Sequence, residues 1–380
     1  MLGLSTGVML VAIALHRPPD RKAANTPEIR GVWMTNIALS GLYHTTFLDE
    51  VLHDIAAHQI NTLYPGVWSQ GKTFYPSRVA PQSLSVGDIL QATVQTGQRQ
   101  GLRVIPWFEY GLKVTDDSQI AQQHPDWLTR NAAGSVYINP QPKPQSLPLL
   151  SGFSRSLSGA NHVVMNPAHP QVQEFMVNLL TDVVERYDID GIQLDDHFAL
   201  PIAFGYDPYT KKLFQQENGY PPPTDPNHPE WMRWRADKLT QLMAKISRSI
   251  KQKKPDLIIS IAPNSPAFAY QESLQDWPTW VRRGYVDEVV VQAYRPTVAE
   301  VNTVLADPEI ETLRQFVPIR VGLYTGPGWQ AQTSAAIAAQ IQVGRNKKYN
   351  GFVLFPWEFS LGPMRRGDLS SLIKVIQNQP

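Results

Sequence analysis

The sequence predicts an α/β fold, a (β/α)8 or TIM barrel with long loops after its third and fourth strands. Short apolar runs alternate with longer amphipathic stretches from about residue 28 onward, a rhythm typical of βα units around a parallel sheet. The rhythm repeats eight times, and most apolar runs end in polar or aromatic residues, as strands do at a barrel mouth. We therefore expect a short leader, 1–27, and one barrel domain, 28–380.

The expected strands are short apolar runs bounded by turn residues. They cover 31–36, 62–68, 103–109, 191–195, 257–262, 288–294, 319–324 and 351–357. Apolar residues at helical spacing predict the helices between and after them. These lie near 47–58, 86–100, 170–187, 231–253, 277–283, 331–347 and 370–377.

Two long connections interrupt the rhythm, at 110–170 and 197–229. The first contains a proline-rich segment, 139–148, and a segment rich in glycine and serine, 151–159. Such compositions are typical of surface loops. Because both connections follow strands, we expect them to extend over the barrel mouth.

The first fifteen residues form an almost uninterrupted apolar run, too short to span a bilayer comfortably and similar in length to the core of a signal peptide. Three prolines between residues 16 and 27 indicate a linker. We expect 1–27 to be a signal peptide or an uncleaved anchor followed by this linker. The protein is then exported to the periplasm or cell envelope, with no other membrane contact.

Composition excludes several classes of function. A net charge of +1 provides no basic field for a nucleic acid or an anionic membrane, and the lack of cysteine excludes a thiol nucleophile and a thiolate zinc site. No glycine-rich nucleotide motif, G-x-S-x-G elbow or H-E-x-x-H motif is present, so we expect no cofactor. Ten Trp and 14 Tyr mildly favour a carbohydrate ligand, because flat amphipathic rings pack against sugars.

The fourth expected strand carries the sharpest signal, in the segment D-G-I-Q-L-D-D-H at 190–197. The two-residue period of a strand puts Ile192 and Leu194 on one face and Gln193 and Asp195 on the other. A carboxylate directed at the mouth is solvated, paired with a cation or catalytic. Asp195 is thus our first catalytic candidate, with an ion pair to a barrel Arg or Lys as the alternative. We expect Asp196 to point away or to lie in the loop.

Glycosidic cleavage needs two carboxyl groups across the scissile bond. Glu109 ends the third strand beside Asp195, and its flanking aromatic rings could raise its pKa toward that of an acid. Glu358 ends the eighth strand across the mouth, where it would reach Asp195 only through a substrate. For each glutamate the alternative is a salt bridge at a loop end.

Other polar and aromatic residues at the strand ends are candidates for binding a sugar, although each aromatic residue alone is more often part of a core. Asp195, Asp196 and His197 could also ligate a metal, but we predict no metal site because no further well-placed ligand is identified. The predicted substrate-binding residues are Trp33, Asn36, Tyr64, Trp68, Trp107, Asp196, His197, Asn264, Gln292, Tyr294, Tyr324 and Trp357.

Several motifs together resemble the family-10 glycosyl-hydrolase-like proteins of bacteria, some of which act on peptide-stripped peptidoglycan strands. The motifs are R-G-V-W-M-T-N at 30–36, P-W-F-E at 106–109, M-N-P at 165–167, D-G-I-Q-L-D-D-H at 190–197 and G-F-V-L-F-P-W-E-F at 351–359. The resemblance covers about 28–359 and implies an exported TIM-barrel glycosidase whose strand-four aspartate is Asp195. The chain departs from many members at Glu109 and His197, where they have an asparagine-containing third strand and a tyrosine.

We therefore expect a glycoside hydrolase that cleaves O-glycosidic bonds of a bacterial polysaccharide, for example peptide-free peptidoglycan strands, through two carboxylates. One alternative is a carbohydrate-binding barrel without catalysis. Another is a metal-dependent polysaccharide hydrolase or deacetylase on the same fold.

Overall fold

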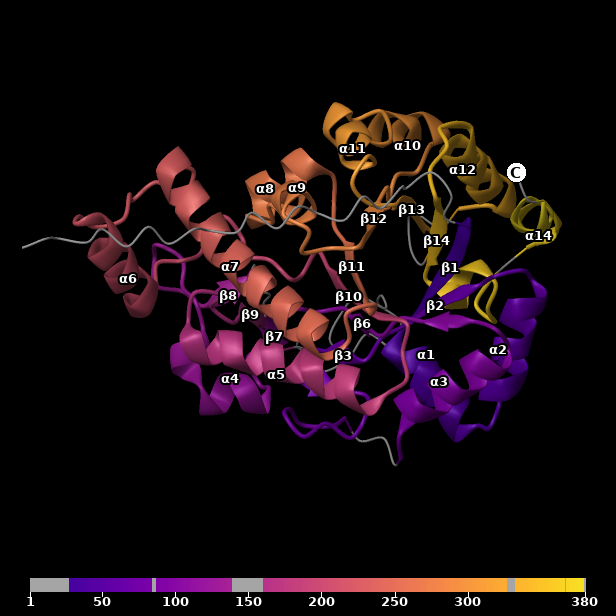
Figure 1. The fold of residues 1–380 in the computed structure, drawn as a ribbon, viewed down its shortest axis with the longest axis horizontal. Coiled ribbons are helices and arrows are strands. Elements are labelled where there is room, and N and C mark those ends of the chain that lie inside the picture. Colours follow the sequence, from indigo (N-terminus) through magenta and orange to yellow (C-terminus); the bar gives the residue numbers. More distant parts are fainter. Residues whose placement is uncertain (1–26, 84–86, 139–159, 327–331, 366, 379–380) are drawn as a thin grey trace, which may run out of the picture.

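The computed structural model describes residues 27–83, 87–138, 160–326, 332–365 and 367–378. It confirms the predicted barrel, since the main sheet is parallel and its outer side is lined by helices (Figure 1). The strands of this sheet follow one another in the order β5 (Arg103–Val104), β2 (Thr62–Pro65), β1 (Ile29–Met34), β14 (Gly351–Phe355), β13 (Ile319–Tyr324), β12 (Glu288–Gln292), β11 (Ile258–Ala262), β10 (Gly191–Asp195) and β6 (Trp107–Phe108).

The two strands at the ends of this order, β5 and β6, are the two halves of the third predicted strand. The barrel closes because each half pairs with a different neighbour. β5 pairs with β2, whereas β6 pairs with β10. Pro106 lies between the halves and has no N–H, so the ladder is interrupted there. Backbone bonds nevertheless continue on both sides: the N–H of Ile105 donates to Leu63 at 2.9 Å, and the N–H of Gln193 donates to Pro106 at 2.9 Å.

The predicted helices are confirmed, with ends shifted by a few residues. They are α2 (Leu48–Ala57), α3 (Ile89–Arg99), α5 (Pro170–Arg186), α7 (Pro229–Lys253), α9 (Trp277–Arg282), α12 (Ser334–Asn346) and α14 (Ser370–Gln377). Each buries an apolar face. Short helices that we did not predict lie in the connections: α1 (Asn36–His44), α8 (Pro266–Ser273), α10 (Val298–Val304), α11 (Pro308–Leu313) and α13 (Trp357–Ser360).

The two long connections contain more secondary structure than we expected. The first holds α4 (Gln119–Gln123), the 3-10 helix η2 (Pro125–Trp127) and an antiparallel sheet in the order β7 (Lys113–Thr115), β9 (His162–Val164), β8 (Tyr137–Ile138). The second holds α6 (Pro208–Asn218), at the left end of Figure 1. A further hairpin, β3 (Trp68–Ser69) and β4 (Lys72–Thr73), follows β2. The segments 139–148 and 151–159 lie outside the described residues.

Some predicted strand ends were wrong because a helix begins there. β1 ends at Met34 and not at Asn36, since the Thr35 side chain accepts a hydrogen bond from the Ala38 N–H and caps α1. β14 ends at Phe355, so Trp357 and Glu358 belong to the first turn of α13.

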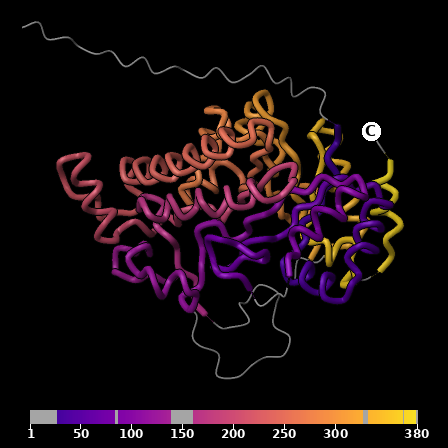
Figure 2. Tube along the Cα trace, turned by 60° about the horizontal axis from the view of Figure 1, so that its bottom comes forward, coloured from indigo at the N-terminus to yellow at the C-terminus, as the bar shows by residue number. Residues whose placement is uncertain are grey.

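The first and last strands of the barrel lie side by side, because β1 pairs with β14 (Figures 1 and 2). Glu28, just before β1, accepts hydrogen bonds from Arg345 of α12 at 2.7 and 3.0 Å. The predicted leader, 1–27, lies outside the described residues except for Pro27. Among the helices of the described segments, none is both long and apolar enough to cross a membrane.

A buried polar network fills the barrel below the mouth, centred on Glu288. Its carboxylate lies 2.9 Å from Arg320 and accepts hydrogen bonds from Tyr64 at 2.7 Å and Ser260 at 3.0 Å. Burial alone would raise the pKa of Glu288, but the Arg320 and Arg103 guanidinium groups lower it below its ordinary value. The network therefore keeps an anion inside the barrel by pairing it completely.

Removing this anion should strongly destabilise the barrel. We expect Glu288→Gln to lower the free energy of unfolding by about 3–5 kcal/mol, because Arg320 would remain buried without its partner charge. Urea unfolding followed by circular dichroism measures the change. Glu309→Gln, which breaks an exposed pair with Arg282, is the control and should cost less than about 1 kcal/mol. Equal losses in the two variants would contradict the role given to the network.

Candidate active site

Asp195 ends β10 at the mouth of the barrel, as predicted, and its carboxylate is held by two donors. The indole N–H of Trp107 donates to Oδ2 at 3.2 Å, and the backbone N–H of His197 donates to Oδ1 at 2.9 Å. Its ion-pair partner is His197, whose Nδ1 lies 3.6 Å from Oδ1. Within the described part of the chain, Asp195 pairs with no arginine or lysine, so the purely structural alternative finds no support.

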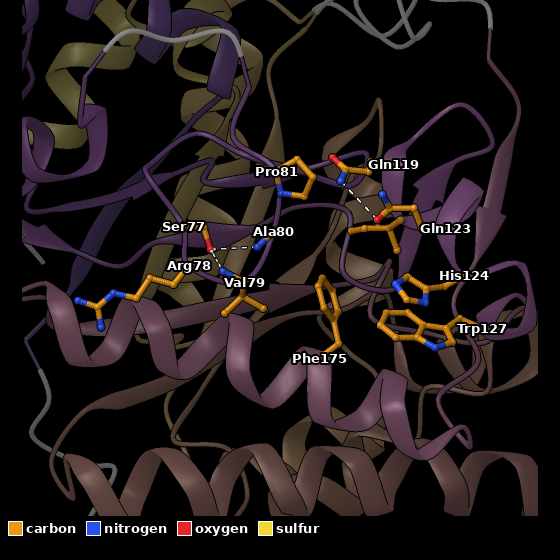
Figure 3. A pocket seen from close by; sticks show the side chains of 11 residues that line it. Ser77, Arg78, Val79, Ala80, Pro81, Gln119, Gln123, His124, Trp127 and Phe175 are labelled. Carbon is orange, nitrogen blue, oxygen red and sulfur yellow. Dashed lines mark hydrogen bonds between the residues drawn. The ribbon is translucent and has the colours of Figure 1, made fainter.

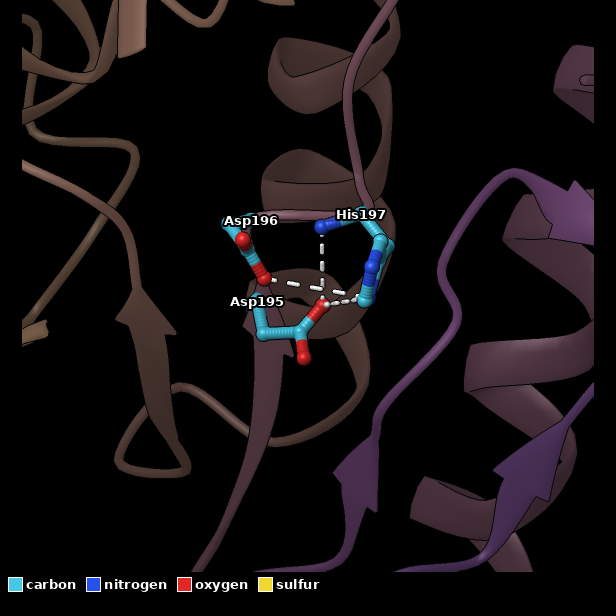
Figure 4. Close-up of side chains that lie close together, drawn as sticks. All are labelled: Asp195, Asp196 and His197. Carbon is cyan, nitrogen blue, oxygen red and sulfur yellow. Dashed lines mark hydrogen bonds and ion pairs between the residues drawn. The ribbon is translucent and has the colours of Figure 1, made fainter. Parts of the chain in front are cut away.

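The carboxylates of Asp195 and Asp196 both face the same ring nitrogen of His197 (Figure 4). This nitrogen, Nδ1, is 3.7 Å from Asp196 and also donates to the backbone carbonyl of Glu109 at 3.0 Å. Burial by itself lowers the pKa of His197, but the Asp196 and Asp195 carboxylates outweigh it and raise the pKa to about 9. The imidazole is therefore a cation at neutral pH.

Asp196 lies in the turn after β10, the second of the two placements that we expected. It accepts hydrogen bonds from Asn264 at 3.0 Å and from Gln292 at 3.3 Å. The Gln292 amide also donates to the Ala262 carbonyl, which fixes its orientation. Asp196 thus links the ends of β11 and β12 to His197.

Glu109 directly follows Phe108, the last residue of β6. Phe108 pairs with Leu194, the residue before Asp195. The carboxyl group of Glu109 is half-buried and makes no hydrogen bond to any residue that the structure describes. Burial and the neighbouring Asp195 carboxylate raise its pKa to about 8, against the opposing effect of His197. At neutral pH, Glu109 is therefore mostly protonated and free to donate its proton.

Glu358 is 4% exposed and is held by Thr35. The Thr35 backbone N–H donates to Oε1 at 3.0 Å and the hydroxyl donates to the same oxygen at 2.6 Å. The other oxygen, Oε2, is buried without a partner among the described residues. Burial raises the pKa of Glu358, and its charge acts on Glu109. Because Thr35 directly follows β1, these bonds fix Glu358 at the β1 side of the mouth.

Two rings that link the loops after β6 and β10, those of Tyr110 and His162, were not among the predicted site residues. Tyr110 stacks on His197, with ring centres 5.1 Å apart, and on His162, at 5.7 Å. Gly111 allows this contact, because a Cβ there would lie 2.5 Å from the Phe198 nitrogen. Tyr110 follows the predicted Glu109 directly, a position that could have indicated its place, whereas His162 is brought there only by the pairing of β7 with β9.

The predicted aromatic residues fall into two groups. Tyr294 and Tyr324 are half-buried near the rim, where Tyr294 stacks on Phe355 with ring centres 5.7 Å apart. The other predicted aromatic residues, together with Asn36, are buried, with exposed fractions of at most 9% for each residue. They are Trp33, whose N–H donates to Gln193; Tyr64, bound to Glu288; Trp68, whose N–H donates to the Gly111 carbonyl; and Asn36, Trp107 and Trp357.

Asp195, Asp196 and His197 also offer ligand atoms that all lie within 4.8 Å of one another. The ring nitrogen near both carboxylates is Nδ1, which donates to the Glu109 carbonyl. An ion bound to this nitrogen would have to replace that proton. The geometry therefore favours an imidazolium paired with the two carboxylates over a ligated metal.

A separate cavity of about 360 Å³ lies on the flank of the barrel, between the segment after β4 and the helices α4, η2 and α5 (Figure 3). The His124 ring lies over the Trp127 ring, with centres 4.0 Å apart, and Phe175 faces the same space. None of the predicted site residues lines this cavity. It is therefore distinct from the mouth.

The parallel barrel has the fold of TIM-barrel glycoside hydrolases. The model of the family described as glycosyl hydrolase-like 10 matches residues 28–342, and the chain belongs to this family. This agrees with the resemblance inferred from the motifs.

The chain is similar to proteins that are themselves named glycosyl hydrolases or glycoside hydrolase domains. The chain is 24% identical over 331 residues to glycosyl hydrolase DigH of Escherichia coli strain K12, covering 76% of this chain and 70% of DigH. It is 21% identical over 344 residues to glycosyl hydrolase YngK of Bacillus subtilis strain 168, covering 77% of this chain but 58% of YngK. The glycoside hydrolase domain of PgaB (BpsB) from Bordetella bronchiseptica shares the fold, with a TM-score of 0.67 and 15% identity, over 93% of this chain and 100% of that domain.

The charge on His197 can be tested directly. We expect Asp196→Asn to lower the pKa of His197 from about 9, because one of the two carboxylates that raise it is lost. Since the folded value lies above the ordinary 6.5, the stabilisation from the imidazolium is complete below about pH 6.5 and is lost as the pH rises through about 9. Titration of the imidazole nitrogens by NMR measures the change. Asp54→Asn, on α2, should leave His197 unchanged, and an unaltered titration in Asp196→Asn would contradict the assignment.

Proposed function

We propose that this protein is a glycoside hydrolase that cleaves O-glycosidic bonds of a bacterial polysaccharide, namely peptide-free peptidoglycan strands. Glu109 is the general acid that protonates the leaving oxygen. Asp195 is the carboxylate that stabilises the positive charge developing on the sugar, as a nucleophile or as a base for water.

The difference in pKa between these two carboxyl groups carries the proposal. Burial raises the pKa of Asp195 to about 6, against the opposing effect of His197. The pKa of Glu109 is raised to about 8. Around pH 7 one group is therefore mostly ionised and its neighbour mostly protonated. Neighbouring carboxyl groups in unlike environments are the arrangement that divides acid and base roles in glycosidases.

The hydrogen bonds support the same division of roles. Asp195 accepts from Trp107 and His197, and these donors stabilise and orient an anion. Glu109 has no such donors among the described residues. When Glu109 gives its proton to the glycosidic oxygen, the C–O bond breaks and the leaving sugar departs as an alcohol. The anomeric carbon then bonds either to Asp195, in which case water later attacks this carbon and gives its proton to the Glu109 carboxylate, or directly to a water molecule that gives its proton to Asp195.

The substrate class is supported by similarity and by the sequence. DigH and YngK are named glycosyl hydrolases, and the motifs resemble proteins that act on peptidoglycan. The expected leader indicates export, and the polysaccharides of the cell wall lie outside the cytoplasm. We therefore propose a periplasmic or envelope location for the enzyme.

Loss of either carboxyl group should abolish most cleavage. We expect Asp195→Asn and Glu109→Gln each to lower the turnover of peptide-free strands by about 100-fold or more. Release of reducing ends by purified residues 28–380 measures this. Asp225→Asn, in an exposed loop, is the matched control and should retain full activity.

Other results would redirect the proposal. Binding of glycan without cleavage by the parent would indicate a carbohydrate-binding barrel. Loss of activity on chelation would indicate the metal-dependent alternative, with Asp195, Asp196 and His197 as its ligands. Full activity of either variant would remove that residue from the mechanism.

The pH dependence gives a second test. We expect activity to rise as Asp195 ionises, near pH 6, and to fall as Glu109 loses its proton, near pH 8. Any residual activity of Glu109→Gln should lose the alkaline limb, because the glutamine does not titrate. Initial rates between pH 4 and 10 decide this, and an alkaline limb retained in Glu109→Gln would assign the acid to another group.

A further inference from the structure

Lys113 is a charged residue at the edge of the mouth that the mechanism above does not use. It is the first residue of β7, four residues beyond Glu109, and its side chain is half-buried. The residue lies in the long connection 110–170, in which we expect surface loop, so the sequence alone does not single out the lysine.

The backbone fixes Lys113 beside the catalytic loops. The N–H of Leu112 donates to the His197 carbonyl at 3.2 Å, and the N–H of Lys113 donates to the Tyr110 carbonyl at 2.7 Å. Leu112 and Val114 are fully buried, so strand alternation puts the Lys113 side chain on the opposite face of β7.

The same face of the small sheet carries the ring stack of the mouth. Thr115 lies on this face of β7 and pairs with His162 of β9. His162 in turn stacks on Tyr110. Lys113 therefore lies on the side that faces the catalytic residues.

Lys113 interacts electrostatically with the carboxylates at the mouth but forms no ion pair with a described residue. The Asp196 and Asp195 carboxylates raise its pKa, but burial has the larger effect and lowers it. Other lysines with limited exposure have direct partners, such as Lys238 with Glu217 at 2.6 Å and Lys251 with Asp287 at 2.6 Å. For Lys113, the described segments provide neither a hydrogen bond nor an ion pair to the ammonium group. Its three donors are thus available to a ligand.

We propose that Lys113 binds a carboxylate carried by a sugar of the substrate. The inference rests on the proposed function and specifies the substrate class as an anionic glycan. In a peptide-free peptidoglycan strand, that carboxylate is the lactyl group of the muramic acid residue. When a peptide is attached, the same group is a neutral amide and offers the ammonium group no charge. Lys113 would therefore select strands from which the peptide has been removed.

The test compares two substrates that differ in this charge alone. Peptide-free strands carry free lactyl carboxylates, and the same strands treated with carbodiimide and ammonia carry neutral amides. We expect the parent to prefer the free form and Lys113→Met to lose about 10- to 100-fold in kcat/KM on it, mainly through KM. The loss on the amidated form should be small. Lys113→Arg should restore part of the preference, and Lys211→Met, on the distant α6, should resemble the parent.

A second measurement separates this inference from the proposed function. Calorimetric titration of both strand types into Asp195→Asn, with and without Lys113→Met, reports binding where no bond is cleaved. A preference for the free carboxylate that Lys113→Met removes supports the inference, even if the parent proves inactive. If the parent cleaves both substrates and Lys113→Met loses the same factor in kcat/KM on each, Lys113 acts only on the charges of the mouth. Three results would overturn the inference: equal losses on both substrates, a parent that does not prefer the free carboxylate, and binding of neither strand.

Discussion

The site depends on the imidazolium of His197, which interacts with three of the carboxyl groups at the mouth, those of Asp195, Asp196 and Glu109. The imidazolium is close to Asp195 and Asp196 and donates to the backbone of Glu109. Its positive charge lowers the pKa of both Asp195 and Glu109, which burial alone would raise further. Without this cation the carboxyl groups would repel one another, and fewer of them would ionise at neutral pH.

The split in the third strand connects this local chemistry to the whole fold. β5 and β6 join β2 to β10, so the chain of hydrogen bonds that closes the barrel also places Trp107 against Asp195. Below them, Gln193 accepts from Trp33 and donates to Ser260, which donates to Glu288. Barrel closure and orientation of the catalytic carboxylate therefore share the same residues.

The sequence was sufficient for features that are continuous along the chain. The fourth strand and Asp195 followed from a two-residue alternation, and seven helices followed from their apolar faces. Contacts made only in three dimensions were not accessible. The bond from Thr35 to Glu358 joins residues 323 positions apart, and His162 reaches Tyr110 through an antiparallel sheet formed inside a presumed loop. The buried positions of Trp33 and Trp68 likewise depend on neighbours that no local pattern specifies.

The pairing of β1 with β14 has a consequence for how the molecule can be held. Glu28 and the start of β1 lie at the amino ends of the parallel strands, where Arg345 fixes them, whereas Asp195 and Glu109 lie at the carboxyl ends. Any polypeptide preceding residue 27 therefore joins the barrel at its floor. A surface attached through that segment would therefore be joined to the end of the barrel opposite Asp195 and Glu109.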